Sequence, residues 1–190
     1  FPSSSGYGDP VQKVLKFKDG EKIVDSMAIK AGQDRQTEIL SEYNYCLEEN
    51  DHLLLVSRNG VGFAYKATDF AGIKKNGRRI MKLRAGDELA AVSKLASHAA
   101  FFTRNASALI IKTKEAPVRD SAAVGVSLIS VRKDDALVSA ICFNNKARFK
   151  ISKSNGKIEE VDSKDMLSGH RALKGNKVIS RAEILAVERL

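Results

Sequence analysis

The stretch His52-Leu-Leu-Leu-Val-Ser-Arg-Asn-Gly-Val-Gly-Phe-Ala-Tyr-Lys66 decides the fold that we expect for this chain. Asn59-Gly60 at its centre is a strong hairpin signal, because both central positions of a type I′ turn need a positive φ. After a basic loop, residues 79–92 contain two more β-like runs around the turn Ala85-Gly-Asp-Glu88. Residues 52–92 therefore predict two hairpins in succession, which is the strand content of one four-stranded propeller blade.

The same pattern recurs twice further along the chain. Arg58-Asn59 matches Arg104-Asn105 at a shift of 46 residues, and Asn59-Gly60 matches Asn155-Gly156 at a shift of 96. Upstream, residues 17–24 match 83–90. A period of this length is typical of an array in which no unit buries its apolar face alone.

We therefore expect an all-β protein with one domain at residues 11–190, after a linker at residues 1–10. Its parts are a leading hairpin at 11–28, an insertion at 30–51, and three whole repeats at 51–95, 98–143 and 147–190. A lone two-stranded hairpin is marginally stable in water, so the leading hairpin is expected to pair with a neighbouring repeat.

Charge is distributed unevenly over the 190 residues, whose net charge is +9. Residues 1–50 carry 6 basic and 9 acidic side chains, whereas residues 51–190 carry 26 basic and 14 acidic ones. The repeats are thus the basic part, which favours a polyanion held by its backbone. No apolar run approaches the 18 residues of a membrane-spanning helix. Two cysteines without CxxC spacing favour reduced thiols and a cytoplasmic location. The chain begins with Phe1 rather than Met, and we expect a piece of a longer protein.

Neither catalysis nor a bound cofactor is expected of this chain. The three histidines, His52, His98 and His170, lack the spacing of metal ligands. The carboxylate pairs Asp87-Glu88 and Asp134-Asp135 fall at repeated turns, for which turn formation is the better explanation. No nucleophile and base stand in a recognisable constellation. We therefore predict no catalytic residue, no metal and no cofactor.

Residues 53–66 with Asp69-Phe70, followed by residues 80–89, resemble the repeat of the C-terminal domain of bacterial type IIA topoisomerase A subunits. This family comprises the A subunits of DNA gyrase and topoisomerase IV. The resemblance is strongest in the first repeat, weakest in the third, and extends over most of residues 11–190. It implies a β-pinwheel, a propeller-like array of four-stranded blades that exchange strands with their neighbours, here with fewer blades than the usual six.

The resemblance also implies a function. Such a domain is not catalytic itself, and it binds and bends double-stranded DNA along a basic outer rim during ATP-dependent strand passage. Its parent would be an isomerase of the bacterial nucleoid, with a breakage–reunion domain in the A subunit and an ATPase B subunit as partners. The family's gyrase box has its counterpart at residues 72–79, where the Gly-Gly core of the box is missing. The residues kept there are Lys74, Lys75, Gly77, Arg78 and Arg79. This degenerate box implies DNA anchoring without full gyrase-like wrapping, and it leaves open a topoisomerase IV or a divergent gyrase parent.

The cations of the repeats are the residues that we expect to contact phosphates. They are Arg58, Lys66, Lys74, Lys75, Arg78, Arg79, Lys82, Arg84, Arg104, Lys112, Arg119, Arg132, Lys153, Arg171, Lys174 and Lys177. The alternative is a propeller that binds other proteins. An interaction face of that kind is rich in aromatic residues, and this chain has 6% aromatics and no Trp. The phenylalanines Phe63, Phe70 and Phe101-Phe102 recur regularly and are expected to form the core.

Overall fold

The structure, a computed structural model, describes residues 20–24, 26, 28–29, 46–48, 50–67 and 77–190. The described residues form short strands and two single turns of 3-10 helix, Thr113–Glu115 and Ser163–Asp165, and they contain no α-helix. The strands are β1 Ala28–Ile29, β2 Cys46–Leu47, β3 His52–Ser57, β4 Val61–Lys66, β5 Leu89–Lys94, β6 His98–Thr103, β7 Ser107–Lys112, β8 Val118–Arg119, β9 Val126–Ser127, β10 Leu137–Phe143, β11 Arg148–Lys153, β12 Ile158–Asp162, β13 Asn176–Lys177 and β14 Ile184–Arg189. The all-β prediction is confirmed.

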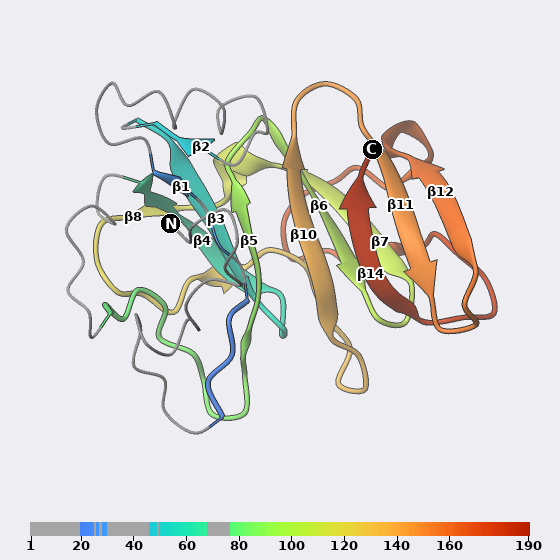
Figure 1. Cartoon of the computed structure of the whole chain (residues 1–190), viewed down its shortest axis with the longest axis horizontal. Helices are drawn as coiled ribbons and strands as arrows, with labels where there is room; N and C mark the ends of the chain where they lie inside the picture. The colour runs from blue at the N-terminus through green and yellow to red at the C-terminus, as the bar shows by residue number, and fades with distance from the viewer. Residues whose placement is uncertain (1–19, 25, 27, 30–45, 49, 68–76) are drawn as a thin grey trace, which may run out of the picture.

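Three sheets stand side by side like the blades of a fan (Figure 1). Sheet 1 has the strand order β5-β3-β4-β8, with β9 also paired to β4; sheet 2 has the order β10-β6-β7-β13; sheet 3 has the order β14-β11-β12. The strands β5, β10 and β14 lie next to one another at the inner side of the fan. The strands β8, β13 and β12 consequently form the outer edges of the three sheets.

Strands are exchanged between neighbouring repeats, as the family resemblance implied. The strands β8 and β9 come from the second repeat and complete sheet 1 by pairing with β4. The strand β13 comes from the third repeat and completes sheet 2 by pairing with β7. In the described part of the chain, nothing of this kind pairs with β12, and sheet 3 has three strands.

The predicted second hairpin of the first repeat is wrong. Residues 82–84 form no strand, although a turn closes there with the Asp87 N–H donating to the Arg84 carbonyl at 3.0 Å. The strand β5 pairs with β3 instead, and Met81 forms a bridge to Ala123 of the second repeat. A blade is thus assembled from two repeats, and the prediction of four strands within one repeat does not hold.

The leading hairpin predicted at residues 11–28 lies mostly outside the described residues. Its described positions 21–24 form no strand. The strand β1 pairs in parallel with β2, which comes from the predicted insertion at 30–51. The linker at residues 1–10 also lies outside the described residues.

The turn between β3 and β4 also differs from its prediction. It is a three-residue loop in which Gly60 has a φ of +74° and donates its N–H to the Ser57 carbonyl at 2.9 Å. Asn59 is not in the left-handed region, so the turn is not of type I′. A turn followed by one left-handed residue is the usual three-residue hairpin loop. Ala106 and Gly156 hold the same place in the next two repeats, with φ values of +66° and +76°.

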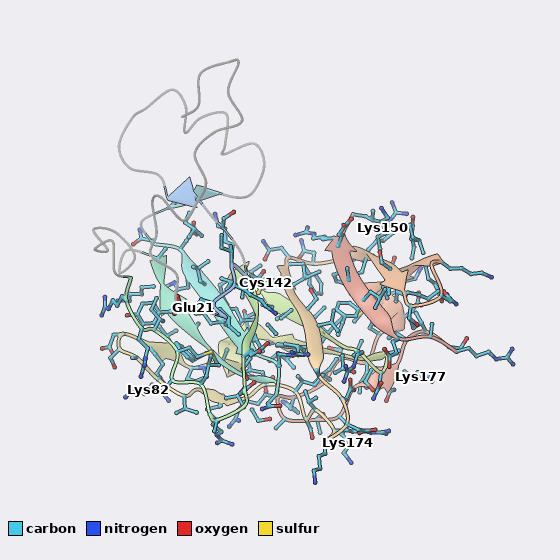
Figure 2. The ribbon with its side chains drawn as sticks, turned by 60° about the horizontal axis from the view of Figure 1, so that its bottom comes forward. Glu21, Lys82, Cys142, Lys150, Lys174 and Lys177 are labelled. Atoms are coloured by element: carbon cyan, nitrogen blue, oxygen red, sulfur yellow. The ribbon has the colours of Figure 1, made fainter. Side chains whose placement is uncertain are left out.

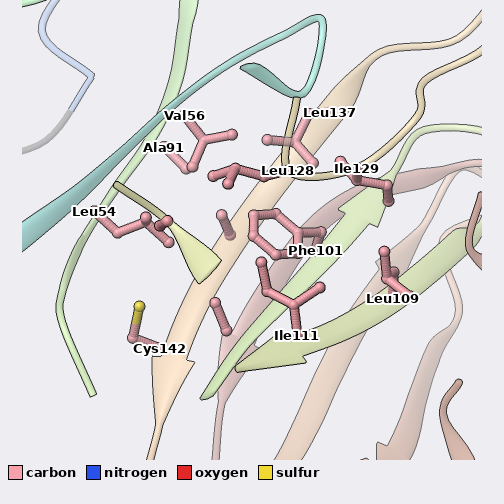
Figure 3. Packing of buried hydrophobic residues seen from close by; sticks show 13 residues of the cluster. Leu54, Val56, Ala91, Phe101, Leu109, Ile111, Leu128, Ile129, Leu137 and Cys142 are labelled. Carbon is pink, nitrogen blue, oxygen red and sulfur yellow. The ribbon is translucent and has the colours of Figure 1, made fainter. Parts of the chain in front are cut away.

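Apolar side chains fill the spaces between the sheets. Figure 3 shows the cluster between sheets 1 and 2, where Phe101 is surrounded by aliphatic side chains such as Leu54, Leu109 and Leu128. Between sheets 2 and 3, Phe102 packs edge-on against Phe149 with ring centroids 5.1 Å apart. The prediction that Phe63 and Phe101-Phe102 form core is confirmed, while Phe70 lies outside the described residues.

The free face of sheet 3 is polar rather than apolar. Lys150 lies 3.8 Å from the Glu188 carboxylate, and Arg148 lies 3.7 Å from the Glu160 carboxylate. In sheets 1 and 2 the places of Lys150 are taken by the buried residues Leu54 and Ala100. Sheet 3 therefore presents a solvated end face, like a capping unit of a repeat array.

Candidate nucleic-acid interface

The outer strands of sheets 1 and 2 each carry an exposed cation. Arg119 ends β8 and Lys177 ends β13, and both side chains are exposed. Neither forms an ion pair with any residue that the structure describes. Because these strands are the outermost ones of their sheets, the two charges lie on the perimeter of the fan.

The loop between β12 and β13 adds more cations at the same perimeter. Backbone bonds fix this loop against the second repeat: the Ala172 N–H donates to the Leu128 carbonyl at 3.0 Å, and the Leu173 carbonyl accepts from Ser130 at 2.9 Å. Lys174 follows directly and extends away from the ribbon (Figure 2). Lys82 and Lys177 lie toward the same lower side in that view, whereas Lys150 lies on the opposite side.

Arg171 in this loop already forms hydrogen bonds with other parts of the protein. Its guanidinium donates to the Ser127 carbonyl at 3.5 Å, and its backbone N–H donates to the Glu115 carboxylate at 2.9 Å. The side chain is nevertheless exposed. It can therefore approach a phosphate only while leaving or sharing its contact with the protein.

The first repeat places a second group of cations on the surface. Arg78, Arg79, Lys82 and Arg84 are all exposed. The Lys82 N–H donates to the Ala123 carbonyl at 2.8 Å, so this segment lies along the loop of the second repeat. Lys74 and Lys75 of the degenerate box lie outside the described residues.

The hairpins contribute cations at their two ends. Lys66 and Lys112 end β4 and β7 and are exposed, but Asp162 holds the same place in β12. At the turns, the Arg58 guanidinium lies 3.1 Å from the Glu88 carboxylate with its side chain 47% exposed. Arg104, at the corresponding turn of sheet 2, is half-buried. Of the two turn arginines, Arg58 is thus exposed but engaged in an ion pair, and Arg104 is partly covered.

The outer strand of sheet 3 is acidic, whereas the outer strands of sheets 1 and 2 each carry a cation. The Lys153 ammonium lies 2.7 Å from the Glu159 carboxylate, and its side chain is only 11% exposed. Lys153 therefore serves an ion pair across the β11–β12 hairpin and is left out of the interface. The outer strand β12 carries Glu159, Glu160 and Asp162. Hence the basic perimeter extends over sheets 1 and 2 and ends at sheet 3.

Two kinds of reactive group, metal ligands and thiols, can be checked among the described residues. No group of three or more His, Cys, Asp or Glu side chains among them is placed to hold a metal ion. Cys142 is buried, and burial raises the pKa of its thiol to about 11 against the opposing effect of a hydrogen bond with Ser93. A thiol with so high a pKa is protonated at neutral pH and is a poor nucleophile. No described helix is long and apolar enough to cross a membrane.

Comparison with known proteins agrees with this geometry. The model of the DNA gyrase C-terminal domain family, a β-propeller, matches residues 51–96 and 98–144, which are the first two repeats. No curated protein matches the chain in sequence.

Several solved structures are similar in fold, and three of them are described here. The C-terminal domain of DNA topoisomerase IV superposes with a TM-score of 0.80 at 16% identity, over 96% of this chain and 55% of that one. The E. coli ParC C-terminal domain gives 0.69 at 17% identity, over 99% and 73% of the two chains. The DNA gyrase A C-terminal domain gives 0.55 at 12% identity, over 96% and 75%. This chain thus spans about half the length of the topoisomerase IV domain.

Proposed function

We propose that this chain, a member of the DNA gyrase C-terminal domain family, is the non-catalytic duplex-binding domain of a type II topoisomerase A subunit, of the gyrase or the topoisomerase IV kind. The observation that carries the proposal is the pair of exposed cations on the outermost strands of adjoining sheets, Arg119 on β8 and Lys177 on β13. Strand exchange places both at the perimeter, where a rod-like polyanion can touch them in succession.

The chemistry of this perimeter suits phosphates rather than bases. Lys and Arg side chains on short outer strands can neutralise phosphate oxygens, but they do not form a helix or ribbon that enters a groove. Binding is therefore expected to tolerate any sequence. Bending a site of 20–30 base pairs around the perimeter costs on the order of 1–6 kcal/mol. Released counterions from several phosphate contacts can offset that cost at low salt.

In the parent enzyme, the domain would hold a duplex segment while another part of the protein breaks and rejoins DNA. We infer that its partners are the breakage–reunion domain of the A subunit and the ATPase B subunit, acting in the bacterial nucleoid. The segment Gly77-Arg78-Arg79 keeps part of the gyrase-box charge at an exposed position. It supports anchoring of DNA at the first repeat, with Lys74 and Lys75 as further expected contacts.

A protein-binding propeller is less well supported. Every aromatic side chain that the structure describes is buried. The exposed large apolar residues are all aliphatic, namely Ile23, Val24, Leu83, Val118, Val124, Ile158, Leu173, Leu185 and Leu190. Recognition faces for proteins are enriched in aromatic residues, so the exposed cations favour DNA.

The test is the binding of labelled duplexes of unrelated sequence, followed by fluorescence anisotropy over a range of salt concentrations. We expect similar affinities for all sequences and a linear fall of log K with log salt, with a slope of about −0.9 per phosphate contacted. An affinity that does not change with salt, or that depends on one particular sequence, would contradict the proposal.

A further inference from the structure

A polar notch lies where the second and third repeats meet. It has a volume of about 540 Å³ and opens between the outer strand β13 and the turn that follows β6. Its polar lining consists of Asn105, Ser107, Arg132, Asn176, Lys177 and Glu183. The notch lies outside the apolar core, and no paired strand of the described chain occupies it.

The walls of the notch are held by hydrogen bonds within the second repeat and by strand pairing between the second and third repeats. The Asn105 N–H donates to the Asp135 carboxylate at 2.9 Å, and the Asp135 N–H donates to the Arg132 carbonyl at 3.0 Å. On the other side, Lys177 is paired with Ser107 through the β13–β7 ladder. Side chains from three separate parts of the chain are thereby held around one opening.

The notch contains more cationic than anionic groups, and its cations are not engaged. Arg132 and Lys177 are exposed and form no ion pair with the described residues. Glu183 lines the same notch, yet its carboxylate is not within ion-pair distance of either cation. An anion at this place would be attracted and would find amide and hydroxyl donors beside the two cations.

The corresponding place between the first and second repeats is closed. There Val61 and Arg84 hold the places of Ser107 and Arg132, but the space between them does not admit water. Its lining combines the apolar residues Met81, Leu83 and Val124 with the polar residues Ser57, Lys82 and Asp87. The amide of Asn176 has Val126 as its counterpart, as their pairings with β7 and β4 show. The open, polar notch is therefore specific to the second junction and is not a general property of the repeat.

We propose that this notch seats one phosphate group of the bound DNA backbone between Arg132 and Lys177, with the amide of Asn176 as a further donor. The inference rests on the proposed function, and it adds a fixed point at which the duplex is held in register on the perimeter. A phosphate seated between two cations has charge-assisted hydrogen bonds on two sides. By contrast, exposed lysines such as Lys174 would follow the backbone without fixing its position.

The decisive variant is Asn176→Val, because it leaves the net charge unchanged. It places in the notch the residue that the chain itself uses at position 126, so β13 is expected to pair with β7 as before. We expect DNA affinity to fall by about tenfold at low salt, as for the loss of a hydrogen bond to a charged group. Glu183→Gln should have the opposite effect and raise affinity by about twofold to fivefold. Lys150→Gln, on the opposite side of the molecule, serves as the control and should change little.

The cations are tested by a double-mutant cycle. If Arg132 and Lys177 hold the same phosphate, either Gln variant alone should change the salt slope little, because the remaining cation still neutralises that phosphate, and the double variant should reduce the slope by about 0.9. If Arg132→Gln and Lys177→Gln each reduce the salt slope by about 0.9, and Asn176→Val binds DNA like the parent, the two cations are independent surface charges. That result would contradict the proposed phosphate site in the notch. Loss of the proposed function is a different outcome, recognised when the parent protein itself shows no salt-dependent binding of DNA. Circular dichroism of each variant separates unfolding from lost contacts.

Discussion

The hydroxyl of Tyr65 donates a hydrogen bond to the backbone carbonyl of Asp120, 3.2 Å away and 55 residues later in the chain. Tyr65 is fully buried in β4, and Asp120 follows β8 in the loop of the second repeat. The bond therefore fastens the exchanged strand to the sheet that receives it. It also contributes a hydrogen-bond partner to the buried phenol, and a buried hydroxyl needs such partners because its burial without them is costly.

Removing this hydroxyl tests how much its hydrogen bond contributes to the free energy of unfolding. Tyr65→Phe should lower the free energy of unfolding by about 1 kcal/mol, the usual net value of a buried hydrogen bond, since the ring itself is kept. Urea denaturation measures the change. The affinity for DNA should stay the same, because Tyr65 is buried away from the perimeter. An unaltered stability would mean that the exchanged strand is held by its backbone pairing alone.

A matched pair of glycine variants tests the close approach of the repeats. Gly60 and Gly156 both have a φ near +75°. An alanine at either position is therefore expected to destabilise the folded state by roughly 1–2 kcal/mol, because a residue with a Cβ is strained in the left-handed region. A Cβ on Gly60 would lie 2.5 Å from the Ile129 carbonyl oxygen, whereas a Cβ on Gly156 would meet no described atom within 4 Å. Gly60→Ala should therefore be the more destabilising by about 1–3 kcal/mol. Equal losses in urea denaturation would contradict the inter-repeat contact.

The acidic outer strand of sheet 3 predicts a gain of function. Asp162→Lys would restore the cation that Lys66 and Lys112 provide in the other two sheets. We expect tighter DNA binding and a salt slope steeper by about 0.9, for one added phosphate contact.

The control for this variant is Asp162→Asn. The Asp162 carboxylate accepts a hydrogen bond from the Lys164 N–H at 3.0 Å, and an asparagine oxygen can keep that cap. Asp162→Asn removes repulsion without adding a contact, so its affinity should lie between those of the parent and Asp162→Lys. If both variants bind like the parent, DNA does not reach sheet 3 even when its charge is changed.

The buried thiol predicts a dependence of stability on alkaline pH. Burial raises the pKa of Cys142 to about 11, above the value of about 8.5 for a thiol in an unfolded chain. The folded state therefore holds this proton more tightly, and its contribution is fully present below pH 8.5. Between about pH 8.5 and 11 it declines by up to about 1.4 kcal/mol per pH unit. The difference between the parent and Cys142→Ala, measured by denaturation across this range, isolates the thiol. Parallel pH profiles for the two proteins would contradict the assignment.

Local signals in the sequence predicted the first hairpin of the repeat, but they did not predict that a sheet is assembled from two neighbouring repeats. Asn59-Gly60 and the apolar residues around it were sufficient to place β3 and β4, because turn and strand preferences act over a few residues. The run 79–84 alternates like a strand as well, yet it lies against the loop of the second repeat, where Met81 meets Ala123. That outcome depends on a neighbour more than 40 residues away, which periodicity does not encode.

The candidate site was predictable to a similar degree. The excess of cations in the repeats could be read from the sequence. Most of the predicted site cations that the structure describes are exposed. The pairing of Lys153 with Glu159 could have been found, because the turn at Asn155-Gly156 brings these two side chains together across the hairpin. The notch could not, since Arg132, Lys177 and Glu183 meet only once the third repeat has docked on the second.

Strand exchange also bears on the order in which the protein can form during synthesis. Because β8 and β9 lie at residues 118–127, the first sheet cannot be completed until most of the second repeat has left the ribosome. The same delay applies to the second sheet and β13. In that interval β4 and β7 each present an open edge, the kind of surface on which nascent chains aggregate. The boundaries at which the sequence repeats are therefore not the places where the chain can be cut into units that fold.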